Sequence, residues 1–216
     1  MDYSAETYFT VLHILRTKSE MLNLLHSGLT LREVAAKLDV DESTISKAVK
    51  ECHRLSLVDN NDSLSQKEYG AVKYPVLHYR IGLVYGYCMR LWSMMKDDFA
   101  PQDDIITIDS DAGKYFLSMS VMEYCERCLK FAVTPSMRKT MILASKGTME
   151  STFIQDVITK EFNLEESTVR GYLKELVDLG LVEKVRKGRQ FNFKADYDLI
   201  SFILMPYESM KKSTVV

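Results

Sequence analysis

The sequence contains no hydrophobic run long enough to cross a membrane. Its longest uncharged apolar stretch, residues 81–89, is far shorter than the roughly 20 residues that a membrane-spanning helix needs. The first nine residues, MDYSAETYF, also lack the basic residues and the apolar core of a signal peptide. We therefore expect a cytoplasmic protein that has no membrane partner.

Neither sign of charge is in large excess. The chain has 28 Lys and Arg against 30 Asp and Glu, and the formal net charge of −2 gives no overall electrostatic argument for a polyanionic partner. The charges are nevertheless unevenly placed, because residues 97–111 contain six aspartates and no Lys or Arg. Arg186, Lys187 and Arg189, in contrast, lie within four residues of one another, and such a basic patch can bind phosphate in a slightly acidic chain.

Only four cysteines are present, and without a secretion signal they do not indicate a disulfide framework. Cys125 and Cys128 form the only close pair, and no second C-x-x-C or H-x-x-x-H pair is available to complete a zinc site. Asp109-Ser-Asp111 lacks the Gly and the terminal Glu of a calcium loop. We predict no metal site and interpret the cysteines as buried thiols that pack as small hydrophobic groups.

Sequence motifs of catalysis are absent as well. The chain has no Gly-rich phosphate loop, no nucleophile elbow and no pair of catalytic carboxylates. Its four histidines are scattered along the chain, at positions 13, 26, 53 and 78. We therefore expect a protein that is not an enzyme, has no catalytic residues and uses no cofactor.

What the sequence does contain is an internal repeat. Residues 40–58 and 164–182 align without a gap at a shift of 124 positions and share the runs Glu-Ser-Thr and Lys-Glu. In the second stretch, apolar residues recur at i, i+4, i+7 and i+10 and form one stripe of a helix: Val169, Leu173, Leu176 and Leu179. Gly180 stops that helix, and an extended run begins at Leu181. Two copies indicate two related domains in tandem rather than a solenoid.

The first copy has the local signals of a helix-turn-helix. Thr30 and Glu33 have the spacing of a capping box, and Asp39-Val40 makes the turn. Asp41 is expected to cap the next helix by accepting from its free N–H groups. The inward face of that helix is predicted to consist of Ile45, Val49, Cys52 and Leu55.

The second copy has a similar set of signals. Pro135 begins its first helix, which closes before Gly147. Thr152 and Gln155 have the spacing of another capping box, and the turn before Leu164 is predicted to be two residues longer than its counterpart.

A β-hairpin is predicted after each helix-turn-helix. In the first copy a strand is predicted to begin at Leu57-Val58, and β-forming residues alternate over 71–81. Pro75 lies in that second run and restricts it to an edge strand. In the second copy, residues 181–185 and 190–194 alternate as a strand pair, and Gly188 supplies the turn conformation. The second hairpin is the better formed of the two and carries the basic cluster.

Residues 82–99 and 113–131 are rich in Met and aromatic side chains, and both are predicted to be helices. Apolar residues fall nearly all round them, so they must be covered on more than one side, by the flanking domains or by a second chain. A pocket for a small apolar effector is an alternative interpretation, but core and dimer packing is favoured. Residues 97–111 would form a linker. We place three domains, at 1–81, 82–134 and 135–216.

Both repeats resemble the winged helix-turn-helix domains of prokaryotic transcription regulators, in the broad manner of the ArsR and MarR families. The residues that carry the resemblance are 34–46 in the first copy and 166–170, 179–182 and 186–189 in the second. The resemblance implies a mainly α fold with small β-hairpin wings, in which tandem winged helix-turn-helix domains are joined by a central helical region. It also implies double-stranded DNA as the partner and a homodimer formed through the central helices.

In such a domain the second helix enters the major groove with its first residues at the base edges, while the wing contacts the backbone. The base-side candidates are therefore Ser43, Thr44, Ser46 and Lys47 in the first copy, and Ser167, Thr168 and Arg170 in the second. The candidates for phosphate contact are Lys50, Arg54, Lys174, Arg186, Lys187 and Arg189. Arg170 is the best candidate for guanine, because its planar fork can donate two hydrogen bonds to O6 and N7.

Three acidic residues argue against DNA at the same helix starts: Glu42, Glu165 and Glu166. They repel phosphate, although they also favour the N-terminus of a helix and can accept from cytosine N4. A sequence-specific transcription regulator is the leading hypothesis. Two alternatives stay open, namely a replication initiator or plasmid-partition protein, and a scaffold whose winged helices bind protein.

Overall fold

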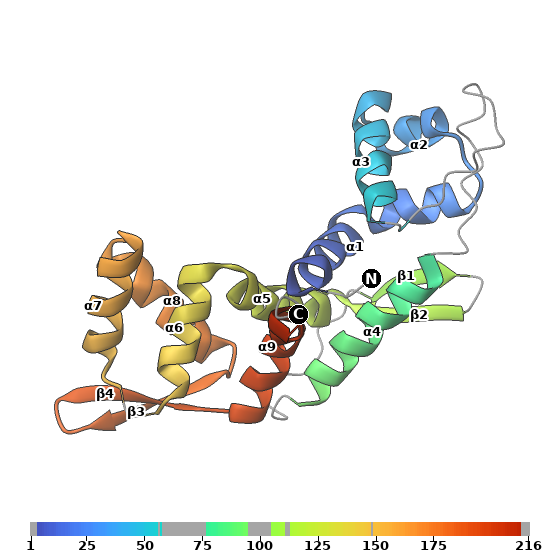
Figure 1. The fold of residues 1–216 in the computed structure, drawn as a ribbon. Coiled ribbons are helices and arrows are strands. Elements are labelled where there is room, and N and C mark those ends of the chain that lie inside the picture. The colour runs from blue at the N-terminus through green and yellow to red at the C-terminus, as the bar shows by residue number, and fades with distance from the viewer. Residues whose placement is uncertain are drawn as a thin grey trace. The chain divides into compact units, whose positions relative to one another are not determined.

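The computed structural model describes residues 4–55, 57, 77–94, 105–110, 113–147 and 149–212. Within these ranges the chain is mainly α-helical and contains two antiparallel two-stranded hairpins (Figure 1), which confirms the predicted fold class. The described residues divide into two compact units: an N-terminal unit within 10–89 and 101–123, and a C-terminal unit within 1–9, 90–100 and 124–216. No helix in the described part of the chain is long and apolar enough to span a membrane.

The N-terminal unit contains most of α1 (Ala5–His26), which is kinked at Lys18, where φ is −132° and ψ is 17°. It continues with α2 (Leu31–Leu38) and α3 (Glu42–Arg54), which form the predicted helix-turn-helix. The capping box before α2 is confirmed, because the Thr30 side chain accepts from the Glu33 N–H and the Glu33 carboxylate accepts from the Thr30 N–H. The buried side chains of these three helices include Leu12, Leu15, Val34, Ile45 and Cys52.

The segment after the first helix-turn-helix differs from the prediction. α4 (Leu77–Ser93) is helical from Leu77, so the expectation that residues 77–81 belong to a β-hairpin is wrong. Leu77–Ser93 contains Leu83, Val84, Tyr87, Cys88 and Leu91, and of these Val84, Cys88 and Leu91 are fully buried. Burial of this helical stripe outweighs the local β-preference of its first turn. The remainder of the predicted first hairpin, residues 58–76, lies outside the described residues.

A hairpin occupies the region that was predicted to be a linker followed by a helix. β1 (Ile105–Ser110) pairs antiparallel with β2 (Gly113–Ser118), and the helix expected from residue 113 begins only at Met119. Alternation within β2 explains the difference. Leu117 is buried, and the centroid of the Tyr115 ring lies 5.1 Å from the centroid of the Tyr85 ring in α4. Phe116 points to the other face and is exposed. An aromatic run with one buried face therefore forms a strand here.

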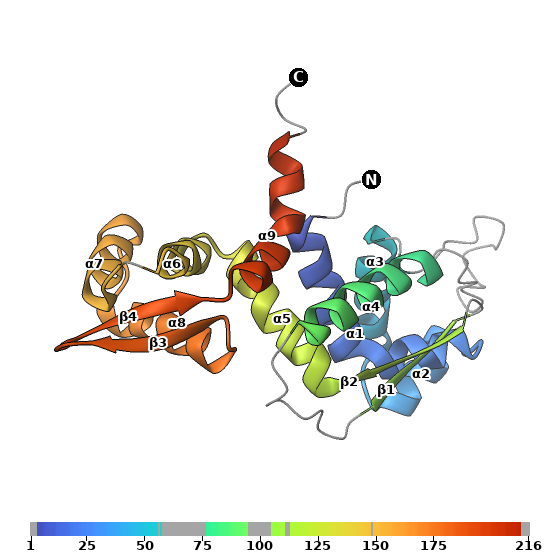
Figure 2. The same ribbon diagram turned by 90° about the horizontal axis from the view of Figure 1, so that it is seen from below.

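The C-terminal unit holds the rest of α5 (Met119–Val133), followed by α6 (Pro135–Ser145), α7 (Ser151–Phe162), α8 (Glu166–Asp178), β3 (Val182–Lys187), β4 (Gln190–Ala195) and α9 (Tyr197–Lys212). Three helices followed by a hairpin is the order expected of a winged helix-turn-helix. The hairpin runs alongside α7 and α8 and ends in a free tip (Figures 1 and 2). Glu150, just before α7, forms an additional β-bridge with Asn192 of β4.

The predicted apolar stripe of α8 is confirmed as core. Val169, Leu173, Leu176 and Leu179 are at most 4% exposed, and α8 packs on α6 and α7. Each such side chain stabilises the unit by about 1.5–3 kcal/mol relative to an exposed position. The opposite side of α8 is left toward solvent, so the core fixes which residues face outward.

Two predicted helix caps are wrong. The Asp41 side chain forms no cap hydrogen bond, although Asp41 is the N-cap residue of α3. Thr152 is not a cap at all, because α7 already begins at Ser151 with Glu150 in the extended N-cap position, and Gln155 donates to Ser151 Oγ instead. The β-bridge between Glu150 and Asn192 holds the backbone extended there, so a tertiary contact sets the start of α7.

Candidate nucleic-acid interface

The two helix-turn-helix copies have the same backbone geometry. Asp39 and Asn163 both adopt the left-handed conformation, with φ of 53° and 50°, and their N–H groups donate to the carbonyls of Ala35 and Thr159. The second helices, α3 and α8, each contain 13 residues. From this turn to the ends of α3 and α8, equivalent positions are 124 residues apart, so the prediction that the turn of the second copy is two residues longer is wrong. The extra length lies at the start of α7.

The first residues of α8 form an exposed polar surface. Ser167, Arg170 and Lys174 are exposed, and Thr168 is half-buried. Gly171, beside Arg170, has no atom within 4 Å of the place where a Cβ would lie. This side of α8 is therefore open to a partner and carries no bulky side chain at its middle.

Arg170 is held by two neighbours. Its Nε donates to Gln155 Oε1 of α7 at 3.1 Å, and its Nη2 donates to Glu166 Oε2, one helical turn earlier, at 2.7 Å. The charge of Glu166, which argued against DNA, is thereby paired with a base-side candidate. The neighbouring Ser167 hydroxyl donates to Glu165 at 3.2 Å. Gln155 had been interpreted as a capping residue, and only the fold brings it to Arg170.

The hairpin that follows α8 supplies a second cationic surface. Arg186, Lys187 and Arg189 are all exposed, and none of them forms a salt bridge within the described ranges. Arg186 and Lys187 end β3, and Gly188-Arg189 is a two-residue loop in which Gly188 has a φ of +64°. A glycine at positive φ in the first loop position is the arrangement of a type II′ turn, which matches the twist of the strands.

Aromatic and apolar side chains lie among the charges of this hairpin. The Lys184 ammonium lies 4.0 Å from the centre of the Phe191 ring, and Phe191 and Val185 are each 40% exposed. Phe193, two residues along the same strand, is buried and anchors the base of the hairpin. The free half of the hairpin thus presents both cationic and apolar groups.

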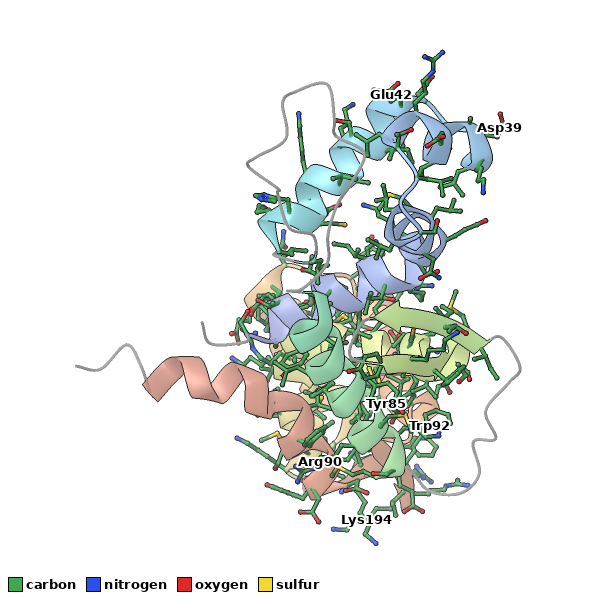
Figure 3. All side chains as sticks on the ribbon, turned by 90° about the vertical axis from the view of Figure 1, so that its right-hand side faces the viewer. Asp39, Glu42, Tyr85, Arg90, Trp92 and Lys194 are labelled. Carbon is green, nitrogen blue, oxygen red and sulfur yellow. The ribbon has the colours of Figure 1, made fainter. Side chains whose placement is uncertain are left out.

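In the first copy the equivalent surface of α3 is also open. Ser43, Thr44, Lys47, Lys50 and Arg54 are exposed, and Ser46 is half-buried. Asp39 and Glu42 mark the exposed end of this helix-turn-helix (Figure 3). The basic hairpin of the second copy has no described counterpart, because residues 58–76 lie outside the described ranges.

The glutamates of the repeated Lys-Glu runs act as tertiary anchors, which sequence reasoning missed. Glu51 accepts from Lys18 of α1 at 2.6 Å, and the equivalent Glu175 accepts from Arg127 of α5 at 3.1 Å. The hydrogen bond from Lys18 holds the pKa of the Glu51 carboxyl below its ordinary value. Because each glutamate is turned toward its own unit, the adjacent Lys50 and Lys174 are left on the exposed side. The sequence signal that could have indicated these anchors is the repetition of the Lys-Glu run in both copies.

The cysteines are buried, as predicted. None of the four forms a disulfide, and all four are 0% exposed. Burial raises the pKa of Cys52 to about 11 and that of Cys128 to about 12. Within the described residues, no cluster of three or more His, Cys, Asp or Glu side chains is suited to a metal ion.

Comparison of the chain with protein-family models and with curated proteins finds no match.

Proposed function

We propose that this chain is a DNA-binding transcription regulator that contacts double-stranded DNA with the start of α8 and with the β3–β4 hairpin. The observation that carries the proposal is the combination, in one compact unit, of an open polar helix face and an unpaired cationic hairpin next to it. A protein α-helix fits the major groove, and a cationic hairpin suits the phosphates beside it.

The side chains divide into two roles. Ser167 and Arg170 near the start of α8 would face base edges, and Thr168 would pack at the rim of the surface. Lys174 and the three basic hairpin residues, Arg186, Lys187 and Arg189, would neutralise phosphates and supply most of the affinity. The bare surface at Gly171 would let the helix backbone approach the floor of the groove.

The acidic residues at the start of α8 are better suited to sequence-specific DNA binding than to binding of any DNA sequence. Glu165 and Glu166 repel phosphate, so they weaken every complex in which the helix start lies against the backbone. Glu166 is paired with Arg170, whereas the hairpin cations have no acidic partner in the described part of the chain. Binding should therefore require the hairpin and favour the orientation that keeps α8 in the groove.

We further propose that α2 and α3 bind a second DNA segment. The support is the similar turn geometry of the two copies and the equal length of α3 and α8, together with the open face of α3. Ser43, Thr44, Ser46 and Lys47 would then face bases, with Lys50 and Arg54 toward phosphate. Two such contacts, within one chain or in a homodimer, would bind two half-sites.

The test is selection of binding sequences from random double-stranded DNA, followed by affinity measurements at two salt concentrations. We expect a recovered motif and an affinity that falls steeply with salt. The variant Arg186→Ala/Lys187→Ala/Arg189→Ala should lower the slope of log affinity against log salt by about 2 to 3, because each lost phosphate contact removes about 0.9. Lys130→Ala, an exposed lysine of α5 outside this surface, is the matched control and should leave the slope unchanged.

Failure of the unmodified protein to bind any DNA would refute the proposal. Binding to partner proteins that survives both the hairpin variant and Arg170→Ala would favour a protein-binding scaffold instead. A motif found as direct repeats near a replication origin, rather than at promoters, would favour a replication or partition protein.

A further inference from the structure

The two hydrogen bonds of Arg170 fall on one particular edge of its guanidinium group. Nε–H and the adjacent Nη2–H form the side edge, and these are the atoms engaged by Gln155 at 3.1 Å and by Glu166 at 2.7 Å. A guanidinium has five N–H donors in a fixed plane. The end edge is formed by Nη1 and the second hydrogen of Nη2. It keeps two parallel donors that have no acceptor among the described residues.

We propose that Arg170 is a guanine-recognising side chain that Gln155 and Glu166 hold in position before DNA arrives. This inference rests on the proposed function and deepens it by naming the base. Two parallel donors match O6 and N7 of guanine in the major groove, and no other base presents two acceptors there. Gln155 is a positioning residue from α7, and Glu166 is a second one from α8. Fixing the arginine before binding lowers the entropy lost when the contact forms.

The arrangement belongs to the second copy alone. The residue equivalent to Arg170 in the first copy is Ser46, and the residue equivalent to Gln155 is Leu31, although Glu42 matches Glu166. Neither serine nor leucine can reproduce a bidentate donor held by an amide. The two helix-turn-helix copies therefore have different base preferences, and the DNA site of this chain is asymmetric, with the Arg170 guanine on the α8 side only.

We expect that the three residues can be changed without unfolding the unit. Arg170 and Glu166 are 65% and 58% exposed, and exposed i,i+4 pairs contribute little to stability. Gln155 is half-buried, whereas Ile154 and Ile158 are the buried core residues of α7. Changes in DNA binding by these variants thus report on recognition. Circular dichroism and urea unfolding check that each variant stays folded.

The experiment uses the full chain and the motif selected by the unmodified protein. Each guanine of the motif is replaced in turn by 7-deazaguanine, which lacks the N7 acceptor. We expect one guanine at which this replacement weakens binding by about 5- to 100-fold, the range of a good bidentate contact. With Arg170→Ala, which removes all guanidinium donors, normal and modified DNA should bind equally at that position.

Gln155→Ala and Glu166→Gln should reduce the same guanine preference by a smaller factor, because Arg170 stays but is no longer fixed. Glu165→Gln is the matched control for Glu166. It removes the neighbouring charge, which bonds Ser167 and not Arg170, and should strengthen binding to all sequences without changing the guanine preference. Ser46→Ala should leave that guanine unaffected.

The outcomes separate this inference from the proposed function. If Arg170→Ala keeps the guanine preference, or if it weakens binding to all DNA sequences equally, the inference is wrong while DNA binding stands. If Gln155→Ala leaves the guanine preference as unchanged as Glu165→Gln does, the positioning role of Gln155 is refuted. If the unmodified protein binds no DNA, both the inference and the proposed function fail.

Discussion

The Tyr124 hydroxyl of α5 donates a hydrogen bond to the Leu179 carbonyl oxygen at the end of α8, at 3.1 Å. The bond is buried, and the Trp92 ring meets Tyr124 edge-on at a centroid distance of 5.9 Å. One turn further along α5, Arg127 bonds Glu175 of α8. α5 therefore holds the C-terminal end of the proposed recognition helix and leaves its N-terminal end free for a partner.

Tyr124→Phe should destabilise the protein by about 1–2 kcal/mol, because it leaves the buried Leu179 carbonyl without this donor. Urea unfolding measures the change. Tyr197→Phe is the control, since Tyr197 is 65% exposed and should lose almost nothing. Equal stability of the two variants would contradict the structural role of the Tyr124 hydroxyl.

Replacement of two glycines should have opposite effects on stability. Gly188→Ala should cost about 1–2 kcal/mol, because the φ of +64° in the hairpin loop disfavours any side chain. Gly171→Ala should stabilise the protein by about 0.5–1 kcal/mol, since this helix position has open space around it. On the proposed function, the added methyl group should also weaken DNA binding. Thermal unfolding and DNA titration of the same pair of variants test both expectations, and stabilisation by Gly188→Ala would refute the described turn.

The thiols should be almost unreactive in the folded protein. Burial raises the pKa of Cys52 to about 11 and that of Cys128 to about 12, so the reactive thiolate is scarce at pH 8 as well as inaccessible. A chromogenic disulfide reagent should detect far less than one thiol per chain within minutes under native conditions. The same reagent in guanidinium should detect all four. Rapid native labelling of more than one thiol would contradict this burial.

The capping box before α2 should give a measurable pH dependence. Hydrogen bonds from the Thr30 backbone and hydroxyl lower the pKa of the Glu33 carboxyl in the folded state. The carboxylate therefore contributes stability above its unfolded pKa of about 4.3, and this contribution is lost as the pH falls through the lowered folded pKa. Glu33→Gln should thus be less stable than the unmodified protein at pH 7, and the difference should shrink in acid.

Urea unfolding of both proteins from pH 7 down to pH 3 measures that difference. Thr30→Ala, which removes the reciprocal side-chain cap, should cost about 1 kcal/mol at neutral pH, whereas Thr30→Ser should cost much less. A difference between Glu33→Gln and the unmodified protein that stays constant over this pH range would contradict the ionised cap.

The sequence predicted most of what depends on neighbouring residues. The spacing of Thr30 and Glu33 gave the first cap, and the period of Val169 and Leu173 gave the inward face of α8. Gly188 gave the turn of the second hairpin. Each of these rests on interactions within a few residues, so local preference and final structure agree.

Prediction failed where the outcome depended on what a segment packs against. Residues 113–118 and 77–81 are rich in residues that suit either a strand or a helix. Burial of Leu117 favours the strand in the first segment, and the second segment continues into the buried stripe of α4. Thr152 was a plausible N-cap, but the β-bridge formed by Glu150 makes Glu150 the N-cap residue of α7. Local capping energies are small, about 1 kcal/mol, so a tertiary contact of similar size overrides them.

By itself the amino-acid order settled that two helix-turn-helix segments exist, 124 residues apart, and that a basic hairpin follows the second, because helical period and turn chemistry are local properties. Only the tertiary structure decided that Glu175 turns inward to Arg127 while Arg170 is held on the surface by Gln155. Those pairs join residues on different helices, and their meeting depends on how the helices pack. A side chain's partner, unlike its helix, is set by the three-dimensional fold.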